Sequence, residues 1–322
     1  MTEQRTFADA ILSNKRRTTR RERFLTEMDQ VIPWGTLEAL VAPHYPTAGR
    51  GRRPLPMASM LRIYLLQQWF GLSDPQEEDM PYDSEAMRRF ARIDLLSDTV
   101  PDETTICKFR RLLERHQLTA RMFDAVKALL EERQLLLKAG TIVDATIIGA
   151  PSSTKNATPS RDPEMRQTKK GNQCDFGMKM HVATDRRGMI HSITATDAAT
   201  ADITQLPRLL HGQETTLHGD KAYDKAYDKA YDKADDKLHW ELSGGRYLVN
   251  TSGKRTDYWD AINRTRSRNR AMVEHPFHTI KRLWGFTKLR YRGLAKNTVQ
   301  VFALGLLANR FRVRRHLVPH GM

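Results

Sequence analysis

Two kinds of hydrophobic pattern follow one another along the chain, and the change falls near Gly140. Before it, apolar residues recur every three or four positions in the segments 57–72, 105–118 and 120–137. This spacing is the periodicity of amphipathic helices. The segment 101–105, in which a proline and two acidic residues precede such a run, is typical of a helix start. We therefore predict an all-helical N-terminal domain that ends at residue 137.

After Gly140 the pattern is that of strands separated by turns. Residues 141–148 are β-branched and apolar, which indicates a buried strand. The segments 176–185 and 189–198 flank Arg186-Arg187-Gly188 and predict a hairpin. The remaining predicted elements are strands at 215–220 and 246–250, helices at 201–210, 260–283 and 297–315, and a mobile polar loop at 151–173. This order predicts a mixed sheet flanked by helices.

A tandem repeat of four residues begins at Asp220, where DKAY occurs three times and is followed by DKAD. A period of four is too short for a solenoid unit, so we interpret the repeat as a lengthened loop or helix start. The repeat creates an ambiguity, because Asp224, Asp228 and Asp232 have a local sequence similar to that of Asp220. Only Asp220 directly follows a predicted strand, which would give it a rigid platform.

Composition limits the classes of protein that the chain can belong to. The 322 residues are 39% hydrophobic, and no apolar run approaches the roughly 20 residues that cross a bilayer. The first residues lack the pattern of a signal peptide. Neither Cys107 nor Cys174 belongs to a CxxC pair, so neither a zinc site nor a disulfide framework is expected. These features favour a cytoplasmic protein without a membrane partner.

The charge is strongly basic and unevenly distributed. Lys and Arg number 53 against 38 Asp and Glu, and residues 253–322 alone hold 16 of the basic residues but only three acidic ones. An excess of this size favours a polyanionic partner. A solvated tail or a membrane-surface patch is the alternative. Helical patterns and aromatic residues within this region favour nucleic acid.

Three acidic residues are candidates for metal chemistry. Asp144 lies inside an apolar strand, Asp220 ends another strand, and Glu274 stands among many basic residues. A buried carboxylate without a cation is costly, so each of the strand acids needs a partner. Transfer of a phosphodiester is commonly catalysed by two divalent ions, and Mg²⁺ prefers oxygen ligands. Asp185 and Asp197, at predicted strand ends, are rivals for this role.

Two basic residues have helical spacing to Glu274. Arg270 lies four residues before it and Lys281 seven after it, so a helix would place all three on one face. Pro276 is unfavourable inside a helix and predicts a kink. Other basic residues of this region that are expected to contact DNA are Arg266, Arg282, Lys288 and Arg290.

Several of these segments together resemble a known family. Arg270-x3-Glu274-x6-Lys281 resembles the Y-x2-R-x3-E-x6-K signature of insertion-sequence DDE transposases, with Ser267 at the tyrosine position. IVDATII around Asp144, HGDKAY around Asp220 and VEHPFHTIKRLWGF around and after Glu274 resemble, in this order, the acidic blocks of the insertion-sequence-5 group in the insertion-sequence-4 superfamily. PDETTICKFRRLLE (101–114) is similar to the helical N-terminal domain of that group.

The resemblance implies a ribonuclease-H-like α/β fold with a mixed five-stranded sheet at 138–295, a short insertion around 221–260 and a basic C-terminal helix at 296–322. It implies that Asp144, Asp220 and Glu274 hold two Mg²⁺ ions, with Mn²⁺ as a substitute, and that Arg270 and Lys281 contact phosphate. A homodimer would bind double-stranded DNA at the terminal inverted repeats of its element, cleave it there and transfer the strands to target DNA. The protein would lie in a bacterial cytoplasm, associated with the nucleoid. A nuclease without strand transfer and an inactive DNA-binding relic are the alternative functions.

Overall fold

The computed structural model describes residues 17–49, 53–155, 160–170, 172–220, 223, 246–247 and 257–317. Its helical part comprises α2 (Arg20–Val31), α3 (Trp34–Val41), the 3₁₀ turn η1 (Ala42–His44), α4 (Met57–Phe70), α5 (Asp74–Asp83), α6 (Glu85–Ala91), α7 (Glu103–Arg115) and α8 (Leu118–Glu132). The predicted helix start at 101–105 is confirmed, because the Asp102 side chain accepts a hydrogen bond from the Thr105 N–H at 2.6 Å and caps α7.

The second part is built on a six-stranded sheet with β1 (Thr141–Gly149) at its centre. β3 (Gln173–Thr184) pairs antiparallel with β1, and β4 (Ile190–Asp197) pairs antiparallel with β3. On the other side, β5 (Thr216–His218) runs parallel to β1, and β6 (Arg246–Tyr247) runs parallel to β5. The predicted mixed sheet flanked by helices is therefore confirmed.

One strand was not expected. β2 (Arg166–Lys170) pairs antiparallel with the first residues of β3, inside the stretch 151–173 that we predict to be a loop. It is a polar strand, RQTKK, so it lacks the apolar alternation by which a strand is recognised. Backbone pairing with the long strand β3 holds it in place. The loop prediction is wrong for these five residues and for Gln173, the first residue of β3.

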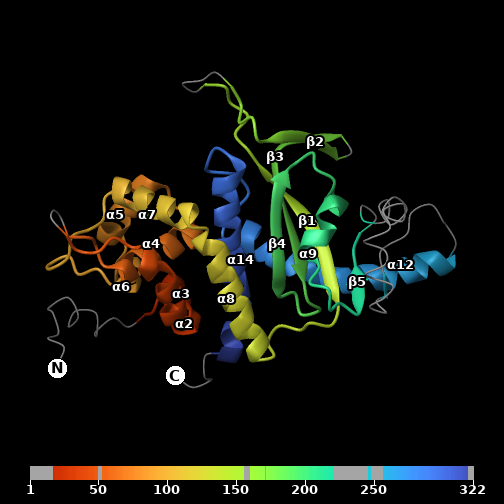
Figure 1. Ribbon diagram of the computed structural model, residues 1–322, viewed down its shortest axis with the longest axis horizontal. Helices are drawn as coiled ribbons and strands as arrows, with labels where there is room; N and C mark the ends of the chain where they lie inside the picture. Colours follow the sequence, from red (N-terminus) through yellow and green to blue (C-terminus); the bar gives the residue numbers. More distant parts are fainter. Residues whose placement is uncertain are drawn as a thin grey trace.

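Helices cover both faces of the sheet (Figure 1). η2 (Asp202–Gln205) and α9 (Leu206–Leu209) follow β4, and α12 (Asp257–Arg270) extends past β5. A broken segment follows, formed by η3 (Ala271–Val273), α13 (Glu274–Phe277) and the π-helix η4 (His278–Leu283). Last comes α14 (Leu294–Leu317), which lies between the helical part and the sheet and contacts α8, β4 and α2.

The two faces of the sheet belong to two apolar cores. Ile142 and Ile148 of β1 share a large core with α2, α4, α8 and α14, so one continuous core joins the helices to this face. Val143, which points to the other face, packs with Leu217 and Tyr223 in a smaller core. Alternation along β1 therefore places Asp144 and Thr146 on the same face as Ile142 and Ile148. In the described part of the chain, no helix is long and apolar enough to span a membrane.

Asn309 of α14 protects the edge of β4. Its side chain accepts the Ile190 N–H at 2.8 Å and donates to the Ile190 carbonyl at 2.7 Å. Gly305, one turn earlier, lets the helix approach the strand closely, because a Cβ there would lie 2.2 Å from Ile193 Cδ1. The last helix thus fixes the edge of the sheet and closes the core.

Candidate active site

Asp144 is fixed by the central strand of the sheet. Its Cα pairs with Val182 of β3, and its side chain is only 13% exposed. One carboxylate oxygen, Oδ1, accepts the backbone N–H of Ala145 at 2.8 Å. The other oxygen points to the helices that follow the sheet, so this carboxylate stands at the junction of the two layers.

Asp220 comes next to Asp144 through the register of two parallel strands. Ile142 of β1 pairs with His218 of β5, and both acids lie two residues further along their chains. Neighbouring strands are about 4.8 Å apart, so continuing this register brings the two acids side by side at the end of β5.

Tyr223 fixes the turn that carries Asp220. Its ring is fully buried in the smaller core, and its N–H donates to the Asp220 carbonyl at 3.1 Å. Gly219 makes room for this ring, since a Cβ there would lie 3.1–3.3 Å from it. The repeat residues Asp224, Asp228 and Asp232 lie outside the described residues.

Glu274 reaches the site from a helix that changes its winding three times. α12 ends at Arg270, a 3₁₀ turn follows, and Glu274 begins the single turn α13. Pro276 lacks an N–H and cannot extend a regular α-helix through this point, which explains the break that the sequence predicts as a kink. The Glu274 side chain is 58% exposed, so it faces the solvent side of the site.

Arg270 links the helix to the strand. Its Nη1 atom lies 2.5 Å from Asp144 Oδ2 and 3.7 Å from Glu274 Oε1. One guanidinium therefore stands between two of the three acids. The sequence predicted Arg270 as a phosphate contact on the same helix face as Glu274, and no sequence pattern indicated that it would bind Asp144.

The pKa of Asp144 also indicates that the three acids lie near one another. Burial raises the pKa of Asp144 to about 7, while Arg270 and the Ala145 N–H oppose this rise. The negative charges of Asp220 and Glu274 raise the pKa of Asp144 further. Each of these two acids is thus near enough to disfavour ionisation of Asp144.

The oxygen atoms of the three acids are suitable ligands for a divalent cation, although the acids are not arranged around a single metal position. Within the described ranges, no group of three His, Cys, Asp or Glu residues is arranged to hold a metal ion as it stands. The guanidinium of Arg270 occupies the space between Asp144 and Glu274. Carboxylate oxygens are the ligands of Mg²⁺ and Mn²⁺, and a cation already lies among them. The residues present therefore fit a divalent ion.

Lys281 fastens the helical segment to β1 from the π-helix. Its Nζ donates to Thr146 Oγ1 at 2.9 Å and to the Ile147 carbonyl at 3.0 Å. Burial lowers its pKa, and the charges of Asp175 and Glu274 oppose this effect. Sequence reasoning missed Thr146, although its position two residues after Asp144 places it on the same face of the strand.

The other predicted DNA contacts occupy different surroundings. Arg282 and Lys288 are exposed, Arg266 is half-buried, and Ser267 takes the tyrosine position as a half-buried residue. Arg290 is exposed but donates to the Leu72 carbonyl at 2.5 Å, which ties it to the helical part.

The rival acids have structural roles. Asp185 is buried and accepts the N–H groups of Leu137, Arg187 and Met189. Asp197 accepts the Ala199 N–H and the Thr200 hydroxyl, both at 2.8 Å. Their oxygens are used by turns of the chain, which leaves Asp144, Asp220 and Glu274 as the candidate set.

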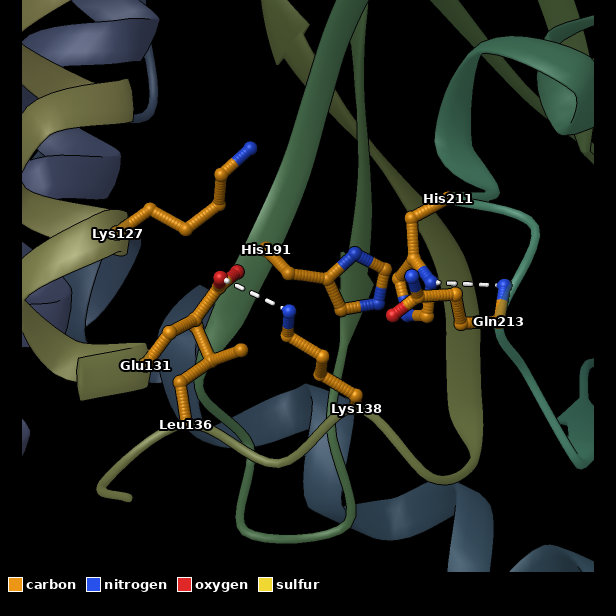
Figure 2. A pocket seen from close by; sticks show the side chains of 7 residues that line it. All are labelled: Lys127, Glu131, Leu136, Lys138, His191, His211 and Gln213. Carbon is orange, nitrogen blue, oxygen red and sulfur yellow. Dashed lines mark hydrogen bonds and ion pairs between the residues drawn. The ribbon is translucent and has the colours of Figure 1, made fainter. Parts of the chain in front are cut away.

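The chain also has a pocket of about 180 Å³ (Figure 2). Its lining residues are Lys127, Glu131, Leu136, Lys138, His191, His211 and Gln213. The two imidazole rings lie 4.9 Å apart edge to face, and His191 Nε2 is 3.1 Å from Thr141 Oγ1 at the start of β1. None of the three candidate acids lines this pocket, so we place the site at the acids rather than at the cavity.

A helical region joined to a sheet of this order, with acids on β1, after β5 and on a following helix, defines the class of ribonuclease-H-like enzymes. Two family models match the chain: "Transposase domain (DUF772)" over residues 13–112, and "Transposase DDE domain" over residues 136–310, which is more than half of the chain. The chain therefore belongs to the DDE transposases of insertion sequences and has a transposase function. No solved structure matches it. Membership of the insertion-sequence-5 group stays a prediction.

Proposed function

We propose that this transposase cleaves DNA at the ends of its own element and joins the freed 3′-hydroxyls to target DNA. Asp144, Asp220 and Glu274 would hold two Mg²⁺ ions, with Mn²⁺ as a substitute. The observation that carries the proposal is the shared guanidinium, because Arg270 lies 2.5 Å from Asp144 and 3.7 Å from Glu274. These acids are 130 positions apart in the chain, yet they surround one cation.

In a two-metal site the bound ions activate the attacking hydroxyl or water and stabilise the charge on the leaving oxygen. The protein orients these groups. β1 and the turn after β5 supply two carboxylates, and Lys281 holds the segment of Glu274 against Thr146. Lys281 uses two of its three N–H donors on β1, so one remains for a phosphate near the cut.

The exposed cations Arg282 and Lys288, together with Arg266, would contact the DNA backbone. Arg290 is the weakest member of this set because it already donates to Leu72. We propose that the helices up to residue 137 recognise terminal inverted repeats and form a homodimer, so that two DNA ends are paired. The domain boundaries at 137/138 and 295/296 and a place at the bacterial nucleoid belong to the same proposal.

The test uses the full chain and a linear duplex that carries the DNA flanking its gene on both sides, incubated with Mg²⁺. We expect cleavage near short inverted repeats, and we expect Asp144→Asn, Asp220→Asn and Glu274→Gln to abolish it while DNA binding is kept. Two matched controls should cleave normally: Asp197→Asn, an acid used by a turn, and Asp224→Asn, which repeats the local sequence of Asp220.

A second duplex, already cut to expose its 3′-hydroxyls, separates the alternatives. Joined product with target DNA supports strand transfer. Cleavage of the first duplex without any joining would identify a nuclease that lacks strand transfer. Binding of both duplexes without metal-dependent chemistry would contradict the proposal and identify an inactive DNA-binding relic.

A further inference from the structure

The guanidinium of Arg270 stands where the carboxylates would converge on a metal ion. Its Nη1 lies 2.5 Å from Asp144 Oδ2, the oxygen that is not used by the backbone, and 3.7 Å from Glu274 Oε1. The Arg270 side chain is 25% exposed and that of Asp144 is 13% exposed, so the pair is mostly shielded from water. The Asp144 oxygen that does not bind the backbone thus pairs with the guanidinium of Arg270.

The acids are the main anchor of this guanidinium. Nη1 makes both contacts, whereas Nε is buried and has no hydrogen-bond partner among the described residues. Lys281 differs, because its ammonium donates to a hydroxyl and a carbonyl of β1 and does not depend on the acids. Arg270 can therefore leave the acids without dismantling the attachment of the helix, while Lys281 cannot leave β1.

A divalent ion and the guanidinium compete for the same oxygens. Each carboxylate lone pair that accepts an N–H is unavailable to a metal, and two neighbouring cations repel one another. A metal ion bound between Asp144 and Glu274 would therefore take the position of the guanidinium and repel it.

We propose that Arg270 is a resting counter-cation. In the metal-free protein it pairs with Asp144 and Glu274 and occupies the position of the metal ion. A divalent ion displaces it, and the released guanidinium, on the same half-buried helix end, then becomes available to a DNA phosphate. The position of Arg270 thus couples metal entry to substrate binding. This inference rests on the proposed function, because it assumes that the acids hold metal.

The test measures Mn²⁺ binding to the full chain without DNA, by electron paramagnetic resonance of the free ion. We expect Arg270→Gln to bind Mn²⁺ about tenfold more tightly than the wild type, because one charge-assisted contact no longer has to be broken. Arg268→Gln is the matched control: it removes the same charge from an exposed position on the same helix, and it should leave the dissociation constant unchanged. Arg270→Lys should fall between wild type and Arg270→Gln.

The outcomes separate the two proposals. Mn²⁺ binding that is lost in Asp144→Asn but unchanged or weaker in Arg270→Gln overturns the counter-cation role and leaves the metal site standing. An equal gain in Arg268→Gln also overturns it, because the effect would then be general electrostatics. Absence of binding in the wild type and in every variant contradicts the proposed function itself.

A measurement on the wild type does not depend on the folding of any variant. Phenylglyoxal labels accessible guanidinium groups, and peptide mass analysis reports the labelling of Arg270 and Arg268 separately. We expect Mg²⁺ to accelerate the labelling of Arg270 severalfold and to leave that of Arg268 unchanged. Equal or slower labelling of Arg270 with Mg²⁺ would show that the guanidinium stays among the acids.

Discussion

The contact between Lys281 and Thr146 gives a sharp prediction about what holds the segment of Glu274 in place. Thr146→Val keeps the shape of the side chain and removes one of the two oxygens that accept from the ammonium, at 2.9 Å. The Ile147 carbonyl at 3.0 Å remains. A hydrogen bond to a charged group is worth about 1.5–3 kcal/mol when it is fully buried. Both residues are half-buried and one acceptor survives, so we expect a coupling of about 1 kcal/mol.

A double-mutant cycle measures this coupling. Urea unfolding of wild type, Thr146→Val, Lys281→Met and the double variant gives four free energies of unfolding, and we expect the cost of Thr146→Val to fall sharply once Lys281 is gone. Thr168→Val, at another half-buried strand threonine, should add to Lys281→Met without coupling. If the effects of Thr146→Val and Lys281→Met add within about 0.3 kcal/mol, the contact between Lys281 and Thr146 does not stabilise the fold, which would refute this prediction.

The same variants separate anchoring from phosphate contact. If the third donor of Lys281 meets a phosphate, Lys281→Met lowers the slope of log affinity against log salt by about 0.9. Thr146→Val should leave this slope unchanged and reduce the cleavage rate, because only the position of Glu274 is disturbed. A changed slope in Thr146→Val would mean that the threonine itself contributes to DNA binding.

Four further predictions concern stability, the Asp220 turn and DNA affinity. Burial raises the pKa of Glu77 well above its usual value and keeps the folded form protonated, so stability is lost as pH rises from about 4.5 through the folded pKa. In urea unfolding, the free energy of unfolding of Glu77→Gln relative to that of the wild type should therefore rise by about 1–3 kcal/mol between pH 5 and 8. A variant that is less stable than the wild type at pH 8 would contradict this. Burial lowers the pKa of His191 to about 3, so between pH 6.5 and 3 this residue is protonated in the unfolded chain but neutral in the folded chain. The free energy of unfolding therefore falls as the pH falls through this range. His191→Gln should make this fall shallower, by up to about 1.4 kcal/mol per pH unit between pH 6 and 4. Exposed His316→Gln serves as the control, and an unchanged slope in His191→Gln would refute the assignment. Gly219→Ala should push on the Tyr223 ring, lower stability by about 1–2 kcal/mol and slow cleavage, whereas normal cleavage would show that the turn adapts. Arg282→Gln should weaken DNA binding equally for all sequences and lower the salt slope by about 0.9, and loss of preference for one sequence instead would mean that it reads bases.

Local patterns were sufficient to predict most elements of the fold. The β-branched run of β1, the hairpin around Gly188 and the capped start of α7 each depend on residues close in the chain. β2 was not predicted because its residues are polar and form a strand only by pairing with β3, which a local sequence pattern does not reveal. The winding of the helix from Arg270 to Leu283 escaped for a similar reason, since Pro276 predicts a break but not the 3₁₀ and π turns that surround it.

The candidate acids were also found from the sequence, because each has a distinctive setting: inside a strand, at the end of a strand, or among bases. Their partners were not. Arg270 was predicted to meet phosphate, yet it lies between Asp144 and Glu274, and Lys281 was predicted on the same face but not on Thr146. Helical spacing gives the face on which a side chain lies. It does not give the group that the side chain meets across 120 or more residues of chain, which depends on the register of strands and the packing of helices.

Crystals of the full chain grown with Mn²⁺ would test the central claim most directly, because the anomalous scattering of manganese marks its position. The account predicts one or two ions bound by carboxylates of Asp144, Asp220 and Glu274, at about 2.1 Å from their oxygens, with Arg270 withdrawn from Asp144. Manganese bound elsewhere, for example between the imidazoles of His191 and His211, with the three acids empty and Arg270 unmoved, would contradict it.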